Sequence, residues 1–241
     1  MTGVLAVNGN TVVNITDGLP QLGQFPLIKY GTKSGSGTFT IGTVPVGVVA
    51  SIVYNTGNNS IDLDVASIAL DTWDGLAGGD WDINVTTNWY NAGTGLPTFY
   101  IDGTPVVLND SALGTTTVNL VTNVQPRSIT VMNDVSNYTL IGIGKINGTT
   151  GLNKQGAAVL TIENMNGYTG PTVLSGGTVV VTNLANGGAI SPIGASSASP
   201  TNLVLKGGAL SYGGPSLTIN RGYNLQYNYS SNGVILVPRC L

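Results

Sequence analysis

The sequence predicts an all-β protein, and for most of the chain it favours a parallel β-helix, a β-solenoid of stacked coils. The clearest stretch is residues 151–183, where short runs of β-branched and aliphatic residues are separated by glycine, asparagine and proline. Similar runs return about every eight to twelve residues along the chain. In addition, the segment LSGGT at 174–178 is echoed by LKGGA at 205–209, 31 positions later, and such self-similarity is typical of stacked coils.

Helices have no obvious place in this chain. It contains 35 glycines, and no window places apolar residues at the spacing of one helix face. Glycine and asparagine instead suit the corners of coils, where the backbone takes positive φ at low steric cost. A β-sandwich would also give many short strands with regular turns, so it stays open as the alternative, above all for the N-terminal part.

Composition narrows the classes of function. Charged residues make up only 8% of the 241 residues, and the net charge of −3 comes without a basic cluster, so nucleic acid is not expected as a partner. Histidine is absent, which removes the usual general base and the commonest metal ligand. The single cysteine, Cys240, permits no internal disulfide. No apolar run suits a membrane helix, so membrane insertion is not expected, and we expect Met1 to start a piece of a longer exported protein.

The N-terminal β segment is expected to span residues 1–70. Strands are predicted at 11–15, 25–30, 38–41, 48–55 and 60–65. In the last of these, Ile61, Leu63 and Val65 alternate with Asp62 and Asp64, so both carboxylates are expected to face solvent. The segment is expected to be the end of a preceding repeat unit.

The second domain is expected to span residues 71–241, because the character of the sequence changes at Thr72. A tryptophan-rich opening segment (73–90) is followed by predicted strands at 98–101, 105–108, 115–121, 128–132, 138–141 and 145–147. These lead into the core repeat (151–183). Residues 184–200 are expected to form a long surface loop. The C-terminal coils (201–241) are expected to have strands at 202–205, 209–212, 216–219, 225–229 and 234–237.

The core repeat carries a family resemblance. Its motifs are GLNKQG at 151–156, LTI at 160–162, NGYTG at 166–170 and GGTVVV at 176–181. Together they resemble the passenger-associated transport repeat, also called the autotransporter-associated β-strand repeat, whose pattern runs G-L-x-K-x-G-x-G-x-L-x-L, N-x-Y-x-G-x-T and G-G-T-L-x-V. Departures are Ala157-Ala158, where the family usually places a glycine, and Pro171. The resemblance implies a secreted or surface-displayed bacterial protein built as a right-handed β-helix, with no catalytic residue or cofactor to carry over.

Two groups of side chains near the domain boundary are candidate sites. Trp73, Trp81, Trp89 and Tyr90 could form a platform on which sugars stack, although tryptophans are also large core fillers and could plug the seam between units. The acidic pair Asp80 and Asp82 is a weak candidate for metal binding, because it lacks the further acidic ligands and glycine of a calcium loop. The isolated charges Arg127, Lys145, Lys154 and Arg221 are interpreted as solvated.

The sequence near the C-terminus suggests self-association. Its apolar residues lack a charged cap, and an uncapped coil recruits another chain; the candidates are Val234, Ile235, Leu236 and Val237. We therefore expect a non-enzymatic structural or adhesive module of an extracellular or cell-surface repeat protein. The alternatives are a self-assembling filament subunit and a carbohydrate-binding β-helix. Expected partners are other copies of the chain, glycans or other surface proteins, and no cofactor is expected.

Overall fold

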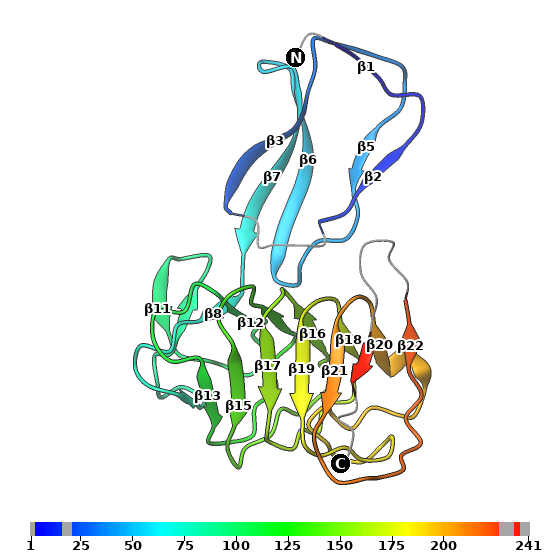
Figure 1. Cartoon of the computed structure of the whole chain (residues 1–241). Helices are drawn as coiled ribbons and strands as arrows, with labels where there is room; N and C mark the ends of the chain where they lie inside the picture. Colours follow the sequence, from blue (N-terminus) through cyan, green and yellow to red (C-terminus); the bar gives the residue numbers. More distant parts are fainter. Residues whose placement is uncertain (1–2, 16–20, 227–233, 237–241) are drawn as a thin grey trace. The chain divides into compact units, whose positions relative to one another are not determined.

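The computed structural model describes residues 3–15, 21–226 and 234–236 (Figure 1). The chain divides into two compact units, Met1–Leu70 and Asp71–Leu241. The described residues form β-strands and one 3-10 turn, η1 (Pro200–Asn202), which confirms the all-β prediction. Among them, no helix has the length and apolar character needed to cross a membrane.

The first unit combines one antiparallel sheet with two parallel strand pairs. In the sheet, β7 (Ser60–Ile68) lies between β3 (Gly23–Lys29) and β6 (Val48–Asn55). The parallel pairs are β1 (Val4–Ala6) with β4 (Thr32–Ser34), and β2 (Thr11–Val13) with β5 (Phe39–Ile41). All five strands predicted here exist with shifted ends or, for 48–55, with the same bounds, whereas β1 and β4 were not predicted.

The prediction that both carboxylates of β7 face solvent is wrong. Asp62 is only 2% exposed, because β7 is the central strand and side chains from both neighbouring strands cover it. Gln24 Nε2 and Asn55 Nδ2 each donate a 2.8 Å hydrogen bond to its Oδ2. The neighbouring Ser60 hydroxyl, and then these amides, hold the pKa of Asp62 below its usual range despite desolvation. Asp64 is half-buried.

The second unit consists of two sheets between which the chain alternates. The nine-stranded sheet contains, in spatial order, β11 (Leu96–Thr98), β10 (Trp89–Asn91), β8 (Asp71–Trp73), β12 (Val106–Asn109), β14 (Ile129–Met132), β16 (Leu152–Gln155), β18 (Thr172–Leu174), β20 (Leu203–Leu205) and β22 (Asn224–Leu225). The seven-stranded sheet contains β23 (Val234–Leu236), β21 (Ala209–Tyr212), β19 (Thr178–Val181), β17 (Val159–Ile162), β15 (Tyr138–Ile141), β13 (Thr117–Leu120) and β9 (Asp80–Trp81).

From β12 onward, each strand pairs in parallel with the strand two places later in the sequence. Thus Ile129 lies in register with Leu152, and Leu152 with Thr172. Figure 1 shows β13, β15, β17, β19 and β21 following one another in this way. The echo of 31 positions is explained by the pairing, because Leu174 is the register partner of Leu205 and Thr178 that of Ala209.

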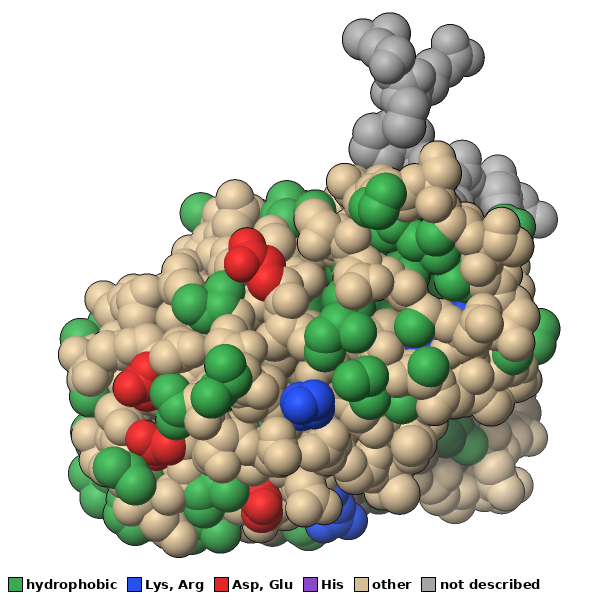
Figure 2. All heavy atoms as spheres, turned by 90° about the horizontal axis from the view of Figure 1, so that it is seen from below, with side chains coloured by type: hydrophobic (Ala, Val, Ile, Leu, Met, Phe, Trp, Pro, Cys, Tyr) green, Lys and Arg blue, Asp and Glu red, His purple; other side chains and the backbone are tan. Residues whose placement is uncertain are grey.

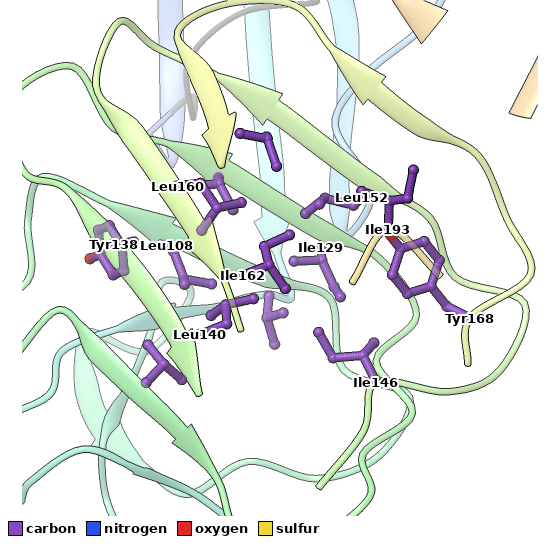
Figure 3. Packing of buried hydrophobic residues seen from close by; sticks show 14 of the residues in the cluster. Leu108, Ile129, Tyr138, Leu140, Ile146, Leu152, Leu160, Ile162, Tyr168 and Ile193 are labelled. Atoms are coloured by element: carbon purple, nitrogen blue, oxygen red, sulfur yellow. The ribbon is translucent and has the colours of Figure 1, made fainter. Parts of the chain in front are cut away.

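The core lies between the two sheets. Strands such as β14 and β15 alternate buried and half-buried side chains, as period-two patterning predicts. Figure 3 shows labelled side chains from strands of both sheets, among them Leu108, Leu140 and Leu160, directed into a common interior. Corners between the sheets are tight: a Cβ on Gly156, whose φ is +74°, would lie 2.3 Å from the carbonyl oxygen of Asn133.

Three local predictions in the second unit are corrected. Residues 216–219 are not a strand, and the chain after them is fixed by a side chain, because the Asn220 N–H donates to Asn186 Oδ1 at 3.0 Å. Residues 145–147 contribute only an isolated bridge, between Val124 and Ile146. The long connection at 184–200 is not purely a surface loop, because the side chain of Ile193 is 1% exposed and belongs to the core.

Candidate functional site

The three tryptophans form one aromatic cluster with Tyr100. Trp73, Trp81 and Trp89 come from β8, β9 and β10, which the turns at 74–79 and 82–88 bring together, and all are at most 1% exposed. The ring centroids of Trp81 and Trp89 are 5.0 Å apart and those of Trp73 and Trp89 5.1 Å, in edge-to-face arrangements. Trp73 Nε1 donates a 2.7 Å hydrogen bond to the carbonyl oxygen of Thr115. The cluster is therefore a tightly packed core element.

The burial of the cluster corrects the interpretation as a stacking platform. The indole rings of Trp73, Trp81 and Trp89 pack on one another and on Tyr100, so no ring face is free to receive a sugar. Of the four candidates only Tyr90 is exposed, at 41%. The cluster fills the interior where the two sheets begin, next to the antiparallel strands β10 and β11.

The acidic candidates are engaged in local hydrogen bonds. Asp80 is exposed, and its Oδ1 accepts a 2.7 Å hydrogen bond from Asn119 Nδ2. Asp82 accepts hydrogen bonds from both the backbone N–H and the hydroxyl of Thr86, which is ordinary turn chemistry. Within the residues that the structure describes, no three His, Cys, Asp or Glu side chains gather in a way that could hold a metal ion.

Lys154 is buried, which corrects its interpretation as a solvated charge. Its side chain is 0% exposed, and its ammonium donates to three backbone carbonyl oxygens: Gln155 at 2.5 Å, Gly156 at 2.9 Å and Gly176 at 3.5 Å. Desolvation lowers the pKa of Lys154 to about 8, although Asp134 and Asp110 act in the opposite direction. The signal was present in the sequence, because period-two alternation places Lys154 on the same face as the core residue Leu152.

Carboxylates tie successive corners of the second unit together. Asp110 accepts hydrogen bonds from the backbone N–H groups of Asp134 and Ser136, at 2.7 and 2.8 Å, and of Val135. Desolvation opposes ionisation there, but these N–H groups outweigh it and lower the pKa of Asp110. Asp134 in turn accepts from the backbone N–H of Ala157, at 3.0 Å. Asp110 and Asp134 therefore each accept hydrogen bonds from backbone N–H groups of the next corner.

Arg221 anchors the long connection at 184–200 and is also not a simple solvated charge. Its Nε donates to the carbonyl oxygen of Ala185 at 2.8 Å, and Nη2 to that of Gly194 at 2.7 Å. The hydroxyls of Ser196 and Ser191 accept from Nη1 and Nη2, at 3.2 and 3.3 Å. One guanidinium group thus donates hydrogen bonds to several residues of the connection that contains the buried Ile193.

Replacing Arg221 with alanine should loosen this connection. Because several of its carbonyl oxygens and hydroxyls lose a charged donor, the free energy of local opening should fall by about 1–3 kcal/mol. Hydrogen exchange of residues 184–200 in the full chain measures this change. Arg127→Ala is the matched control, since Arg127 is exposed and its side chain makes no hydrogen bond within the described residues. Equal exchange in both variants would contradict the role of Arg221.

A row of small side chains runs across the outer face of the seven-stranded sheet. Thr117, Thr139, Thr161, Val180 and Ser211 are successive register partners, and each alternates with buried neighbours along its strand. We call these five residues the hydroxyl row, because all except Val180 carry a hydroxyl group. They are exposed or half-buried, and neighbouring strands are spaced about 4.8 Å apart. The row is therefore an uncharged surface that carries four hydroxyl groups.

The face of the molecule in Figure 2 is also weakly charged. On this face, the few Lys, Arg, Asp and Glu side chains are scattered among neutral and hydrophobic ones.

The predicted self-association residues Val234, Ile235 and Leu236 form β23, which pairs in parallel with β21 and ends the order of the seven-stranded sheet. Val237 lies outside the described residues.

Comparison with known proteins indicates the class of an autotransporter-related surface protein. The chain is 31% identical, over 240 residues and 95% of its length, to the adhesin BmaC, an autotransporter of Brucella suis biovar 1 (strain 1330). It spans only 7% of the length of that protein. The expected location, extracellular or at the cell surface, is confirmed by this relationship. No protein-family model matches the chain, and no solved structure matches it significantly.

Proposed function

We propose that residues 71–241 are a right-handed parallel β-helix of the passenger-associated transport repeat type. The support is the regular alternation between two sheets, in which each strand from β12 onward pairs in parallel with the one two places later. A pair such as β16 and β17 would then form part of one coil, and the core repeat at 151–183 would span β16 to β19. Residues 1–70 would be the end of a preceding repeat unit.

The chain, in this proposal, is a non-enzymatic structural or adhesive module of a surface-displayed bacterial repeat protein. The observation that carries it is the 31% identity to an autotransporter adhesin over 95% of the chain. The described structure adds a stack of short strands whose buried polar groups, such as Lys154 and Asn166, bind backbone groups of the corners and connections between those strands. These residues hold the stack together, so binding to a partner would use its outer faces.

The hydroxyl row is the surface that we expect to act in adhesion. Its side chains are short and β-branched or small, so they lose little conformational entropy when a partner binds. Each contact would be weak, and affinity would come from several contacts made at once by a repetitive surface. A repeat protein that displays many such rows would gain avidity from their number.

Removing hydroxyls from the row should reduce adhesion without unfolding the chain. In the double variant Thr139→Val and Thr161→Val, the β-branched shape stays and the hydrogen-bonding groups are lost, so stability should change by less than about 1 kcal/mol. We expect beads coated with the variant to be retained severalfold less on cultured epithelial cells than beads coated with the unchanged chain. Thr98→Val, in β11 of the other sheet, is the control. Retention no better than that of beads coated with an unrelated neutral protein would contradict the adhesive function.

The filament alternative depends on β23. Because β23 is the last strand in the described order of its sheet, it offers a place where a further strand could add. Negative-stain electron microscopy at rising concentration distinguishes rods of growing length from single particles. The carbohydrate-binding alternative loses its main support, since the three tryptophans are buried.

A further inference from the structure

The sequence contains five Asn-Gly pairs, which begin at Asn8, Asn147, Asn166, Asn186 and Asn232. Glycine without a Cβ lets its backbone nitrogen approach the preceding asparagine side chain. That nitrogen, on losing its proton, can attack the side-chain Cγ. A new C–N bond forms, the bond between Cγ and the side-chain nitrogen breaks, and that nitrogen takes up a proton and leaves as ammonia. Water then opens the resulting succinimide at either carbonyl, which yields aspartate or isoaspartate. A folded structure permits this reaction only where the glycine nitrogen and the asparagine side chain are free to meet.

Asn147-Gly148 lies at an open corner of the second unit. Gly148 is exposed, and neither its backbone N–H nor the Asn147 side chain makes a hydrogen bond within the described residues. The φ of Gly148 is +89°, and a Cβ placed there would come no closer than 3.7 Å to Gln125. Asn147 is half-buried and its amide oxygen lies against Gly167, where a Cβ would meet it at 2.4 Å. The Gly148 nitrogen, in contrast, has open space and no hydrogen bond among the described residues, so it can approach the Asn147 side chain.

Asn8-Gly9 has the same character in the first unit. Both residues are exposed, and no hydrogen bond of the Gly9 N–H exists among the parts of the chain that the structure describes. A Cβ on Gly9 would meet nothing within 4 Å. The nearest neighbours of this pair are the small residues Gly35 and Gly37, where a Cβ would come within 2.9 Å of Asn8 Oδ1 and 2.6 Å of the Gly9 nitrogen. No hydrogen bond of the described structure holds the Gly9 N–H or the Asn8 side chain, so the two groups can still meet.

Asn166-Gly167 is held against reaction. Asn166 is 1% exposed, and its side chain accepts from the backbone N–H of Ile146 at 2.9 Å and donates to the carbonyl oxygen of Pro192 at 3.0 Å. The Gly167 N–H donates to the carbonyl oxygen of Ile146 at 2.8 Å. The attacking nitrogen and the target carbon are both fixed by these bonds.

Asn186-Gly187 is protected although Asn186 is exposed. Its Oδ1 accepts a 3.0 Å hydrogen bond from the Asn220 N–H, and the Gly187 N–H donates to Asn220 Oδ1 at 2.8 Å. Asn220 therefore binds both reacting groups at once. The Asn220 side chain holds the Gly187 nitrogen, whereas the Asn220 backbone holds the Asn186 side chain. Substitution of Asn220 would therefore free the glycine nitrogen.

We propose that Asn147 and Asn8 are sites of spontaneous deamidation through a succinimide, whereas Asn166 and Asn186 are protected by the fold. Each event replaces a neutral amide with a carboxylate and makes the net charge of −3 one unit more negative. Isoaspartate also adds one atom to the backbone path at the corner after Ile146. A chain displayed outside the cell would accumulate these changes with age.

The test incubates the full chain in mildly alkaline buffer made with ¹⁸O water, folded and, in parallel, in concentrated urea. Fragment-ion mass spectra of the digests then give the rate at each asparagine. In urea all four pairs should react at similar rates. In the folded chain Asn147 and Asn8 should stay within a few-fold of that rate, and Asn166 and Asn186 should be at least about tenfold slower, the effect of roughly 1.4 kcal/mol of protection.

A variant makes the protection itself testable. In Asn220→Ala the folded rate at Asn186 should rise toward its rate in urea, while the rate at Asn147 stays unchanged. The inference is overturned if Asn147 reacts as slowly as Asn166 in the folded chain. Equal folded rates at Asn186 with and without Asn220 would overturn the protection by that side chain. Asn232 lies outside the described residues.

Discussion

Replacing Trp81 with alanine should lower the free energy of unfolding of the second unit by about 3–5 kcal/mol. The ring is 0% exposed and packs against Trp89 and Tyr100 with centroids 5.0 and 5.3 Å away, so its removal leaves a cavity among rings that cannot easily close it. Urea unfolding followed by tryptophan fluorescence measures the effect. The signal reports the second unit alone, because all three tryptophans lie in it, and Trp73 and Trp89 remain as reporters.

Tyr90→Ala is the matched control for this loss. Tyr90 lies beside Trp89 in β10 but is 41% exposed, so its truncation should change stability by less than about 1 kcal/mol. A second comparison separates packing from hydrogen bonding. Trp73→Phe removes the donor to Thr115, whereas Trp81 Nε1 has no partner in the described structure, so Trp73→Phe should cost about 1 kcal/mol more than Trp81→Phe. Similar losses for Trp81→Ala and Tyr90→Ala would refute the buried cluster.

Much of the strand pattern could be predicted from the sequence because it depends on local alternation. Val48–Asn55 and Tyr138–Ile141 were expected with the bounds that the structure has, since β-branched runs between turn residues are sufficient to define them. The 31-position echo likewise indicated neighbouring strands, because residues in register meet similar surroundings. These features require no knowledge of distant partners.

The side chains of the candidate sites could not be placed in this way, because their partners lie far along the chain. Trp73 bonds to Thr115, Asp62 to Gln24 and Arg221 to Ala185, across 42, 38 and 36 positions. Burial of these polar and aromatic groups depends on which strands become neighbours, and alternation does not give that order. The antiparallel strand β10 was missed, and the strand predicted at 98–101 shares only Thr98 with β11. The reason is related, since β10 is stabilised by pairing with β8, and β11 by pairing with β10.

Truncating Lys154 should also be strongly destabilising. Lys154→Ala leaves a cavity in the core and removes the donor from the carbonyl oxygens of Gln155, Gly156 and Gly176, which together should cost about 2–5 kcal/mol. Lys206→Ala is the control for the loss of one lysine. Lys206 is exposed and lies at the corner after β20, in the same stack as the corner after β16 that holds Gly156. Urea unfolding by tryptophan fluorescence gives both values at pH 7. A loss for Lys154→Ala no larger than that for the control would show that the ammonium contributes nothing to the stack.

The pH dependence of the same two proteins tests whether the ammonium is buried as a charge. The pKa of Lys154 is about 8 when folded and 10.5 for an unperturbed lysine, so between these values the unfolded chain binds more protons and stability rises with pH. Above about pH 10 stability falls as pH rises. The reason is that burial raises the pKa of Tyr100, Tyr138 and Tyr168 above 10.0, so the unfolded chain loses those protons first. Subtracting the Lys154→Ala curve removes the tyrosine contribution, which both proteins share. The stability difference should therefore widen in favour of the unchanged chain from about pH 8 to 10.5, and a flat difference would mean that Lys154 titrates as an exposed lysine does.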